Sequence, residues 1–202
     1  KSEMPSKNTI KEYECPAFYH VYNRGAGGQA IFRDDIDRKK FLTLLERHLS
    51  PTYTDENEDN YQKFDVELIA YCLMGNHFHL LLYQEHDAFE ISRFMRSIST
   101  AYSMYFNKKY KGQGHVFQSI FRASHISDES YLLHITRYIH LNPEPYKTYR
   151  WSSLPHYIGK DTSNWIHPER VNTIKPDEYL QFLQDYTDRR LILKEIKDQL
   201  AA

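Results

Sequence analysis

Near the middle of the chain the sequence reads Met74-Gly75-Asn76-His77-Phe78-His79-Leu80-Leu81-Leu82-Tyr83, and it directly follows another apolar run at residues 64–73. Two apolar runs around a short turn predict a β-hairpin. Successive side chains of a strand alternate between its faces, so His77 and His79 point one way and Phe78 points the other. Two such imidazoles can be half of a metal site. Without a third ligand, a simpler interpretation is that one histidine caps a loop and the other is partly buried in the sheet, because two ligands alone do not hold a metal.

The segments around this hairpin predict an α+β fold. Strands are expected at 17–24, 64–73 and 77–83, and helices at about 34–49, 88–110 and 129–141, the last of which ends before Pro143. Residues 116–121 alternate in polarity and are expected to form a fourth strand or an extended segment. The order β-α-β-β-α-β, followed by extra helices, predicts an antiparallel sheet with helices on one face.

The chain length and its punctuation predict one main domain. At 202 residues the chain can bury one core, or one core plus an appendage. We expect a loose lead-in at 1–14, the domain at 15–160 and a C-terminal helical extension at 161–202. Within the extension, a polar amphipathic helix or pair of helices is expected over about 176–200.

The composition indicates a soluble globular protein. Hydrophobic residues make up 41% and charged residues 26% of the sequence, which are ordinary values for that class. No apolar run is long enough to span a membrane, and residues 1–10 lack the apolar segment of a secretory signal. Cys15 and Cys72 indicate neither a disulfide framework nor a cysteine zinc site. A reducing, cytoplasmic setting without a membrane partner is therefore expected.

The charge is near neutral overall but unevenly distributed. A net charge of −1 argues against a uniformly basic nucleic-acid-binding protein. Segment 93–122, however, has no Asp or Glu, and its basic residues are Arg93, Arg96, Lys108, Lys109, Lys111 and Arg122. This segment is either a local basic surface or a solvated helix face. The sequence also holds 17 tyrosines and 11 phenylalanines; aromatic rings on a basic surface suit stacking against unpaired bases, although most are expected in the core.

The helix expected at 129–141 carries polar side chains near its end. Tyr138 and Asn142 are four residues apart and lie on one face. If that face meets the histidine strand, two imidazoles and one amide oxygen could bind a divalent ion beside the Tyr138 hydroxyl. Protonated tyrosine, with a pKa near 10, is a poor nucleophile, so a metal that polarises the electrophile complements it. The alternative is a tyrosine packed at a helix end and an asparagine that caps it, and the spacing leaves both open.

Six pieces of the sequence, in order over about residues 18–158, resemble the IS200-like transposases. They are Tyr22-Asn23-Arg24-Gly25, Ile31-Phe32-Arg33-Asp34-Asp35-Ile36-Asp37-Arg38, Tyr71-Cys72-Leu73-Met74-Gly75-Asn76-His77-Phe78-His79-Leu80-Leu81-Leu82, Gly114-His115-Val116-Phe117-Gln118-Ser119-Ile120-Phe121, Arg137-Tyr138-Ile139-His140-Leu141-Asn142-Pro143 and Trp151-Ser152-Ser153. The resemblance is closest to the REP-associated tyrosine transposases, members of the HUH nucleases, which are named for a His–bulky apolar–His motif. Gly75 replaces a usual proline, and Glu144-Pro145-Tyr146 replaces more common small and basic residues, but neither departure removes a catalytic group.

The resemblance implies a ferredoxin-like core and a metal-dependent single-stranded DNA endonuclease and strand transferase. By position, Tyr138 matches the nucleophile, and His77, His79 and Asn142 match the metal ligands. The family points to Mg²⁺ or Mn²⁺, although imidazole ligands also suit Zn²⁺ and Ni²⁺. Such enzymes attack a DNA phosphate next to a hairpin or palindromic repeat, leaving a 5′-phosphotyrosine and a free 3′-hydroxyl. Reversal with another end joins DNA without an external energy source.

The resemblance also suggests DNA contacts, and two other functions stay open. Five arginines in or beside the matching pieces are candidates for phosphate contacts: Arg24, Arg33, Arg38, Arg122 and Arg137. A homodimer is one arrangement the sequence allows. The competing functions are a domesticated module that binds nucleic acid without cleaving it, and a metal phosphodiesterase in which water attacks and Tyr138 only orients the substrate. Tyr102, Tyr105 and Tyr110 are expected to pack in the core rather than supply a nucleophile.

Overall fold

The computed structural model of the chain describes residues 13–54 and 61–185. Most of the expected lead-in, and the expected C-terminal helix beyond residue 185, lie outside the described residues. The strands are β1 (Ala17–Arg24), β2 (Val66–Leu73), β3 (His77–Gln84) and β4 (Arg122–Ile126). The helices are α1 (Asp35–Leu49), α2 (Glu90–Tyr110), α3 (Leu132–Leu141), α4 (Leu154–Tyr157) and α5 (Pro176–Gln184), with 3-10 turns at Ala26–Gly28, Glu129–Tyr131, Tyr146–Thr148 and Pro168–Arg170. Among the described helices, none combines the length and apolarity needed to cross a bilayer.

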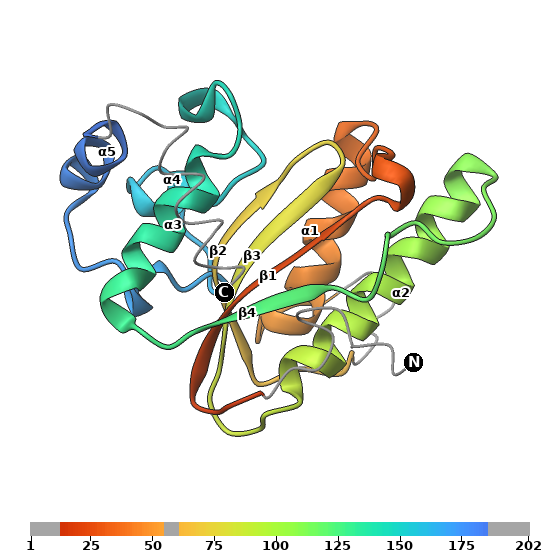
Figure 1. Cartoon of the computed structure of the whole chain (residues 1–202), viewed down its shortest axis with the longest axis horizontal. Coiled ribbons are helices and arrows are strands. Elements are labelled where there is room, and N and C mark those ends of the chain that lie inside the picture. The colour runs from red at the N-terminus through yellow and green to blue at the C-terminus, as the bar shows by residue number, and fades with distance from the viewer. Residues whose placement is uncertain (1–12, 55–60, 186–202) are drawn as a thin grey trace, which may run out of the picture.

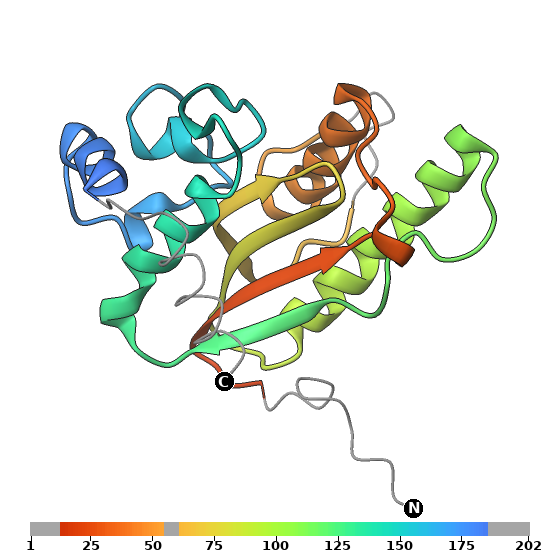
Figure 2. The same cartoon turned by 45° about the horizontal axis from the view of Figure 1, so that its top comes forward.

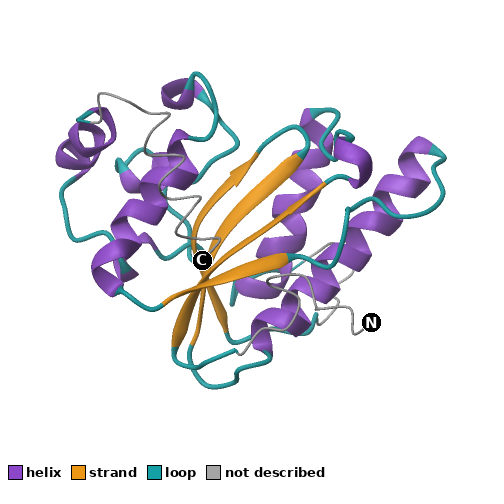
Figure 3. Ribbon diagram, viewed as in Figure 1, coloured by secondary structure: helices purple, strands orange, loops and turns teal. Residues whose placement is uncertain are grey.

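The four strands form one antiparallel sheet in the order β2-β3-β1-β4 (Figure 1, Figure 3). β2 and β3 are the two arms of the predicted hairpin, and β1 pairs with β3 on one side and β4 on the other. With α1 between β1 and β2 and α2 between β3 and β4, this is the ferredoxin-like βαββαβ arrangement. The α+β prediction is confirmed.

α1 and α2 cover one face of the sheet, as Figure 1 and Figure 2 both show. Val21 of β1 and Phe78 of β3 are fully buried there, against Phe41 of α1 and Phe94 of α2. Removing a side chain of this size from water stabilises the fold by roughly 1.5–3 kcal/mol, so this layer fixes which way each strand faces. Because strand side chains alternate, the neighbours of Val21 and Phe78 in sequence must point to the opposite face.

The opposite face is covered in part by α3, α4 and α5. Phe18 of β1 and Leu81 of β3 pack in a second core with Ile135 and Ile139 of α3 and Leu183 of α5. α3 therefore lies across the strands that hold the two histidines. At the other end of the same strands this face carries polar side chains next to the last turn of α3, and the candidate site lies there.

The fourth strand lies later in the chain than the alternation at 116–121 suggests. It comprises Arg122–Ile126, which pairs with β1, whereas the preceding segment is extended and joins the sheet through a single bridge between Gly25 and Phe117. Val116 and Phe117 are both buried although they are consecutive, so the segment does not alternate as a strand would. The expectation of a strand at 116–121 was therefore wrong, and the alternative of an extended segment is what the structure has.

Candidate active site

A polar cavity of about 620 Å³ opens on the sheet face that carries α3. Its floor comes from three adjacent strands, because Tyr22 of β1 lies opposite His79 of β3 and opposite Arg122 of β4. The alternation predicted for the hairpin places Phe78 in the core of the other face and both histidines in the wall of this cavity. The full lining is His20, Tyr22, Asn23, Arg24, Asn76, His77, His79, Gln118, Ser119, Arg122, Tyr138 and Asn142.

α3 brings Tyr138 into the same cavity. Its ring lies edge-on to His79, with centroids 5.3 Å apart and planes at 82°, and edge-on to His20, with centroids 5.6 Å apart. The strand and the helix that the sequence analysis left unconnected therefore meet. Asn142 follows one turn later, still with helical dihedral angles (φ −57°, ψ −47°), and Pro143 comes directly after it.

The hydrogen bonds around His77 fix which of its nitrogens carries the proton. Asn76 directs its amide nitrogen toward the carbonyl of Gly28 (3.4 Å) and its oxygen toward His77 Nδ1 (2.7 Å). An amide oxygen only accepts, so Nδ1 donates, and the neutral ring has an unprotonated Nε2. Burial, followed by the charge of Arg24, lowers the pKa of His77, which favours the neutral ring.

His79 is held by a second imidazole. Its Nδ1 lies 2.9 Å from Nε2 of His20, and the two rings stack at 12° with centroids 5.1 Å apart. One proton lies between these nitrogens. If His79 donates it, Nε2 of His79 keeps a free lone pair. Burial, with further contributions from His20 and His77, holds the pKa of His79 well below its usual range, so the ring is neutral.

Tyr138 and Asn142 are coupled through the end of α3. The Asn142 amide nitrogen donates to the carbonyl of Tyr138 (2.8 Å). Because a carbonyl only accepts, the nitrogen must face it, which leaves the Asn142 amide oxygen available to another partner. Tyr138 is 9% exposed. Burial raises the pKa of its phenol, and a contact with the Asn142 side chain offsets this only in part, so the phenol is protonated at neutral pH.

The turn before His77 is held from both sides. The carbonyl of Gly75 accepts hydrogen bonds from the backbone amides of Ile31 and Phe32, each at 3.0 Å. On the other side, Leu73 donates to the carbonyl of Trp151 at 2.9 Å, and the hydroxyl of Tyr149 donates to the carbonyl of Leu73. Two chain segments far apart in sequence thus hold the turn, although Gly75 lacks the stiffness of a proline.

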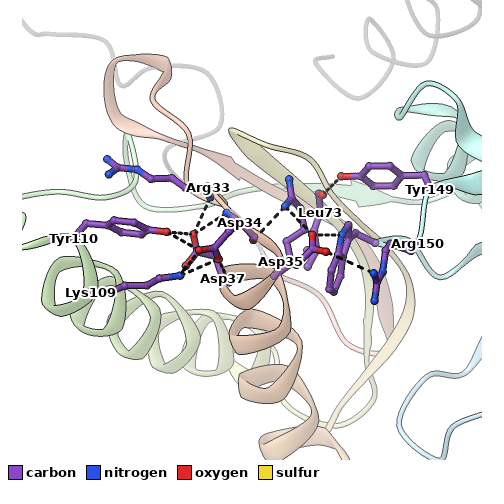
Figure 4. Close-up of polar contacts among 11 residues, drawn as sticks. Arg33, Asp34, Asp35, Asp37, Leu73, Lys109, Tyr110, Tyr149 and Arg150 are labelled. Carbon is purple, nitrogen blue, oxygen red and sulfur yellow. Dashed lines mark hydrogen bonds and ion pairs between the residues drawn. The ribbon is translucent and has the colours of Figure 1, made fainter.

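An ion-pair network at the start of α1 holds the segment that contacts this turn (Figure 4). Asp37 is fully buried and accepts from the backbone amide of Arg33 (2.8 Å), and Lys109 of α2 contacts both Asp37 and Asp34 (2.7 Å each). On the side nearer Leu73, Arg150 pairs with Asp35 at 3.6 Å. The network thus ties α1 to α2 and to the segment after α3.

The predicted phosphate-binding arginines divide into two groups. Arg24 and Arg122 line the cavity. The guanidinium of Arg33 instead stacks on Tyr110 at 4.3 Å, and Arg38 is bonded to the carbonyl of Asp34. Arg137 is 3% exposed, with its guanidinium 3.2 Å from the ring centre of Phe182. The structure does not bring the last three into the cavity.

Two tyrosines of the α2 cluster have partners that explain their positions. The hydroxyl of Tyr102, a fully buried residue, donates to the carbonyl of Ile31 at 2.5 Å, and that of Tyr105 donates to Asp37 at 2.8 Å. Neither lines the cavity with His79. The interpretation of this cluster as packing is therefore consistent with its contacts.

His140, two residues after Tyr138, is a buried support of α3. Its Nδ1 lies 2.7 Å from the hydroxyl of Tyr179 in α5, and its Nε2 lies 2.8 Å from the hydroxyl of Ser153. The Tyr179 hydroxyl donates to Thr136, so it accepts the proton of Nδ1, and Nε2 accepts from Ser153. Burial lowers the pKa of His140 to about 3, in keeping with a neutral ring that has both nitrogens engaged.

Sequence reasoning did not single out several residues that line the cavity: His20, Tyr22, Asn23, Asn76, Gln118 and Ser119. The alternation of β1 places His20 and Tyr22 on one face, but only the pairing with β3 brings them beside His79. Gln118 and Ser119 belong to an extended segment whose position depends on contacts with Arg24 and Asn23. Within the described residues, no group of three or more His, Cys, Asp or Glu side chains could hold a metal ion, and the third ligand predicted from the sequence, Asn142, is an amide.

Comparisons with known proteins agree with this fold and cavity. A family model described as "Transposase IS200 like" matches residues 37–142, more than half of the chain and a range that includes His77, His79, Tyr138 and Asn142. A solved structure described as "Structure of the REP associates tyrosine transposase bound to a REP hairpin" is similar with a TM-score of 0.55 and 14% identity, over 77% of this chain and 88% of that one. At that identity the likeness shows the fold alone. No curated protein sequence matches the chain.

Proposed function

The chain belongs to the IS200-like transposase family, and on that premise we propose that it is a single-strand DNA endonuclease and strand transferase that uses Tyr138 as its nucleophile. The observation that carries the proposal is the edge-on contact of Tyr138 with His79 inside a polar cavity. The Tyr138 ring contacts two imidazoles, those of His79 and His20, and two arginines line the same cavity. These groups together suit a phosphate that is attacked by the phenol.

We propose that His77, His79 and Asn142 hold a divalent ion, Mg²⁺ or Mn²⁺. The donor set fits such an ion, because the hydrogen bonds of Asn76 leave His77 Nε2 unprotonated and the hydrogen bond of the Asn142 nitrogen leaves the Asn142 oxygen to act as a ligand. Asn76 and His20 act on the second nitrogens of the two imidazoles, which is how ligating histidines are usually oriented. When bound, the ion would polarise the phosphate and favour attack on phosphorus.

The proposed reaction is the one that the family resemblance implies, with Tyr138 as the attacking group. The Tyr138 oxygen forms a bond to phosphorus while the bond from phosphorus to the 3′ oxygen breaks. The phenolic proton leaves the tyrosine, and the departing 3′ oxygen takes up a proton. One phosphodiester replaces another, so the 5′-phosphotyrosine can be attacked by a second 3′-hydroxyl and DNA ends can be joined. Arg24 and Arg122 lie where they can neutralise the phosphate.

The proposed substrate is single-stranded DNA beside a hairpin or palindromic repeat. The solved structure that shares the fold is bound to a REP hairpin, and a family member with an open polar cavity can take the same class of ligand. Hydroxyl, amide and guanidinium groups from β1, β4, α3 and the segments that connect the elements line the cavity, and such groups contact phosphates.

A covalent-adduct assay tests the proposal. The protein is incubated with Mn²⁺ or Mg²⁺ and a series of labelled oligonucleotides that carry a hairpin and a single-stranded flank, and denaturing gels report labelled protein. We expect an adduct with wild type and none with Tyr138→Phe, which removes the nucleophilic oxygen but keeps the ring. Tyr22→Phe, which removes the other phenol of the cavity, should retain the adduct.

Each other outcome points to a different function. An adduct that persists in Tyr138→Phe and disappears in Tyr22→Phe would reassign the nucleophile. Cleavage without any adduct, unaffected by Tyr138→Phe, would indicate a phosphodiesterase in which water attacks. Tight binding without cleavage in either metal, across the whole oligonucleotide series, would indicate a non-cleaving nucleic-acid-binding module.

A further inference from the structure

A second cavity lies on the other side of the segment that connects α2 to β4. Figure 1 and Figure 2 both show this segment, residues 111–121, turning back at the end of α2 and running beside that helix to β4. The cavity between the segment and the outer face of α2 measures about 540 Å³. Among its lining residues are Thr100, Ser103, Met104, Asn107, Phe117 and Ile120.

This cavity borders the one that holds Tyr138. Gln118 and Ser119 line both of them, so the two cavities meet at these side chains. The segment is fixed there: Gln118 donates to the carbonyl of Arg24 at 2.9 Å, and Asn107 of α2 donates to the carbonyl of Gly114 at 3.0 Å. An extended chain that leaves the Tyr138 cavity and crosses over Gln118 and Ser119 would reach the second cavity.

A third cavity of about 460 Å³ continues the path along α2. It shares Thr100 and Met104 with the second cavity and extends past Arg96 to Arg93, which pairs with Asp87 and Glu90. We call the two cavities along α2, lined by Arg96, Thr100, Ser103, Met104, Asn107 and Ile120, the α2 track. Residues 96 and 107 are separated by about 16 Å along the helix axis, enough for about two or three nucleotides of extended single strand.

The chemistry of the α2 track suits unpaired bases and their phosphates. Met104 is 70% exposed and Ile120 is 85% exposed, so both offer bare apolar surface to a base. Thr100, Ser103 and Asn107 supply hydroxyl and amide groups between them. No carboxylate occurs from residue 93 to residue 122, and none is among the described residues that line the two cavities.

We propose that the α2 track binds the single-stranded DNA that continues on one side of the cleavage site. Bases lie against Met104 and Ile120, and the backbone is contacted by the polar groups of α2 and by Arg96 at the far end. The inference rests on the proposed function, because the strand enters from the cavity of Tyr138. It gives a role to the carboxylate-free segment, which the catalytic residues leave unexplained.

Binding of oligonucleotides of different length tests the α2 track. Fluorescence anisotropy with the full chain and Mn²⁺ compares a hairpin whose flank ends next to the cleavage site with the same hairpin extended by about six nucleotides, either on the 5′ or on the 3′ side. For wild type, one of the two extensions should increase affinity by about tenfold, an effect of the size of one stacked base. Met104→Glu and Ile120→Glu should each remove most of that increase.

Matched variants separate the track from general effects of charge. Phe89→Glu places the same charge on an exposed apolar residue (62% exposed) outside the track and should leave the gain from extension intact. Thr100→Arg adds a cation to the track, so it should tighten binding of the extended oligonucleotide several-fold. The slope of log affinity against log salt concentration should become steeper by about one. A merely disruptive substitution would not produce that gain.

The outcomes distinguish failure of the track from failure of the proposed function. If neither extension raises the affinity of wild type, or if Met104→Glu and Ile120→Glu keep the full gain, the α2 track does not bind the flank. Adduct formation with the short hairpin at saturating concentration is measured in the same proteins. If wild type forms no adduct, the proposed function is wrong. If wild type forms the adduct but neither extension raises its affinity, only the proposal for the α2 track is wrong.

Discussion

Replacement of Asp37 by asparagine tests how the start of α1 is held. Asp37 Oδ1 accepts from Tyr105 (2.8 Å) and Lys109 (2.7 Å), and Oδ2 accepts from the Arg33 amide (2.8 Å) and from Tyr110 (2.7 Å). An asparagine must turn its NH₂ group toward one of these two sides. The Lys109 ammonium and the Arg33 amide only donate, so either orientation brings two donors together.

The expected loss in the free energy of unfolding follows from how deeply the ion pair between Asp37 and Lys109 is buried. Removing one partner of a buried ion pair costs about 3–5 kcal/mol, because the other charge loses its compensation. The side chain of Asp37 is 0% exposed but that of Lys109 is 25% exposed, so water can compensate the ammonium in part. We expect a loss of about 3 kcal/mol in the free energy of unfolding. For a chain of this size, the melting temperature should fall by roughly 6–12 °C.

Asp34→Asn is the matched control, measured by thermal and urea unfolding. Asp34 pairs with the same lysine but its side chain is 46% exposed, and an asparagine can still cap α1 by accepting from the amide of residue 37. The free energy of unfolding of Asp34→Asn should be lower than that of wild type by less than about 1 kcal/mol. If Asp37→Asn destabilises the protein no more than Asp34→Asn does, the buried carboxylate does not hold the helix start as we argue.

The stability difference between wild type and Asp37→Asn should depend on pH in a defined direction. Burial alone would raise the pKa of Asp37, but hydrogen bonds from Lys109, Tyr110 and Tyr105 outweigh it, so the pKa lies below the ordinary 3.8. A carboxyl whose pKa is lower in the folded state stabilises the fold above its ordinary pKa and loses that contribution as the pH falls through the lowered value. The stability difference between wild type and Asp37→Asn should thus be constant from about pH 8 to 5 and shrink below about pH 3.8.

Three further predictions concern the cavity and its support. Asn76→Ala and His20→Ala each remove a partner of the second imidazole nitrogen of His77 or His79, so Mn²⁺ affinity measured by calorimetry should fall about 10–100-fold, and Tyr138→Phe should bind Mn²⁺ as wild type does. Arg24→Ala should reduce the slope of log affinity for DNA against log salt by about one, whereas Arg33→Ala, whose guanidinium lies on Tyr110, should leave the slope unchanged; equal slopes in the two variants would contradict the division of the arginines. His140 has a pKa lowered to about 3 by burial, so the unfolded state takes up a proton first and stability falls below about pH 6.5, by up to about 1.4 kcal/mol per pH unit for this group. His140→Gln should be less stable than wild type at pH 7, and its stability measured by urea unfolding should fall less steeply between pH 6 and 4; an unchanged slope would mean that the ring is not buried and neutral.

Local patterns in the sequence predicted the parts of the fold that depend on periodicity. The alternation of His77, Phe78 and His79 gives the correct faces because a strand has a fixed period of two. The four-residue spacing of Tyr138 and Asn142 likewise follows from the helix, and the structure has both in the cavity wall. Their roles as nucleophile and ligand stay predictions that the adduct and calorimetric experiments address.

Contacts between distant segments could not be predicted in this way. His20 comes to His79 through the register of β1 against β3, and 59 residues separate them in sequence. Arg137 looks like a phosphate-binding arginine beside the nucleophile, yet a ring from α5 covers its guanidinium. Of the two alternatives for residues 116–121, a strand or an extended segment, the apparent alternation could not decide, because the pairing partner of β1 is determined by the whole sheet.

The buried imidazole of His140 has a consequence for how this sequence can diverge. Ser153, Tyr179 and Thr136 form one directed chain of hydrogen bonds with it, drawn from α3, α5 and the segment before α4. A single exchange in this chain leaves a buried polar atom unpaired, which costs more than replacing the whole set by apolar residues of similar shape. Natural relatives that keep the nucleophile helix should therefore keep these residues together or lose them together. This joint inheritance would extend well beyond residue 142, where the family match ends.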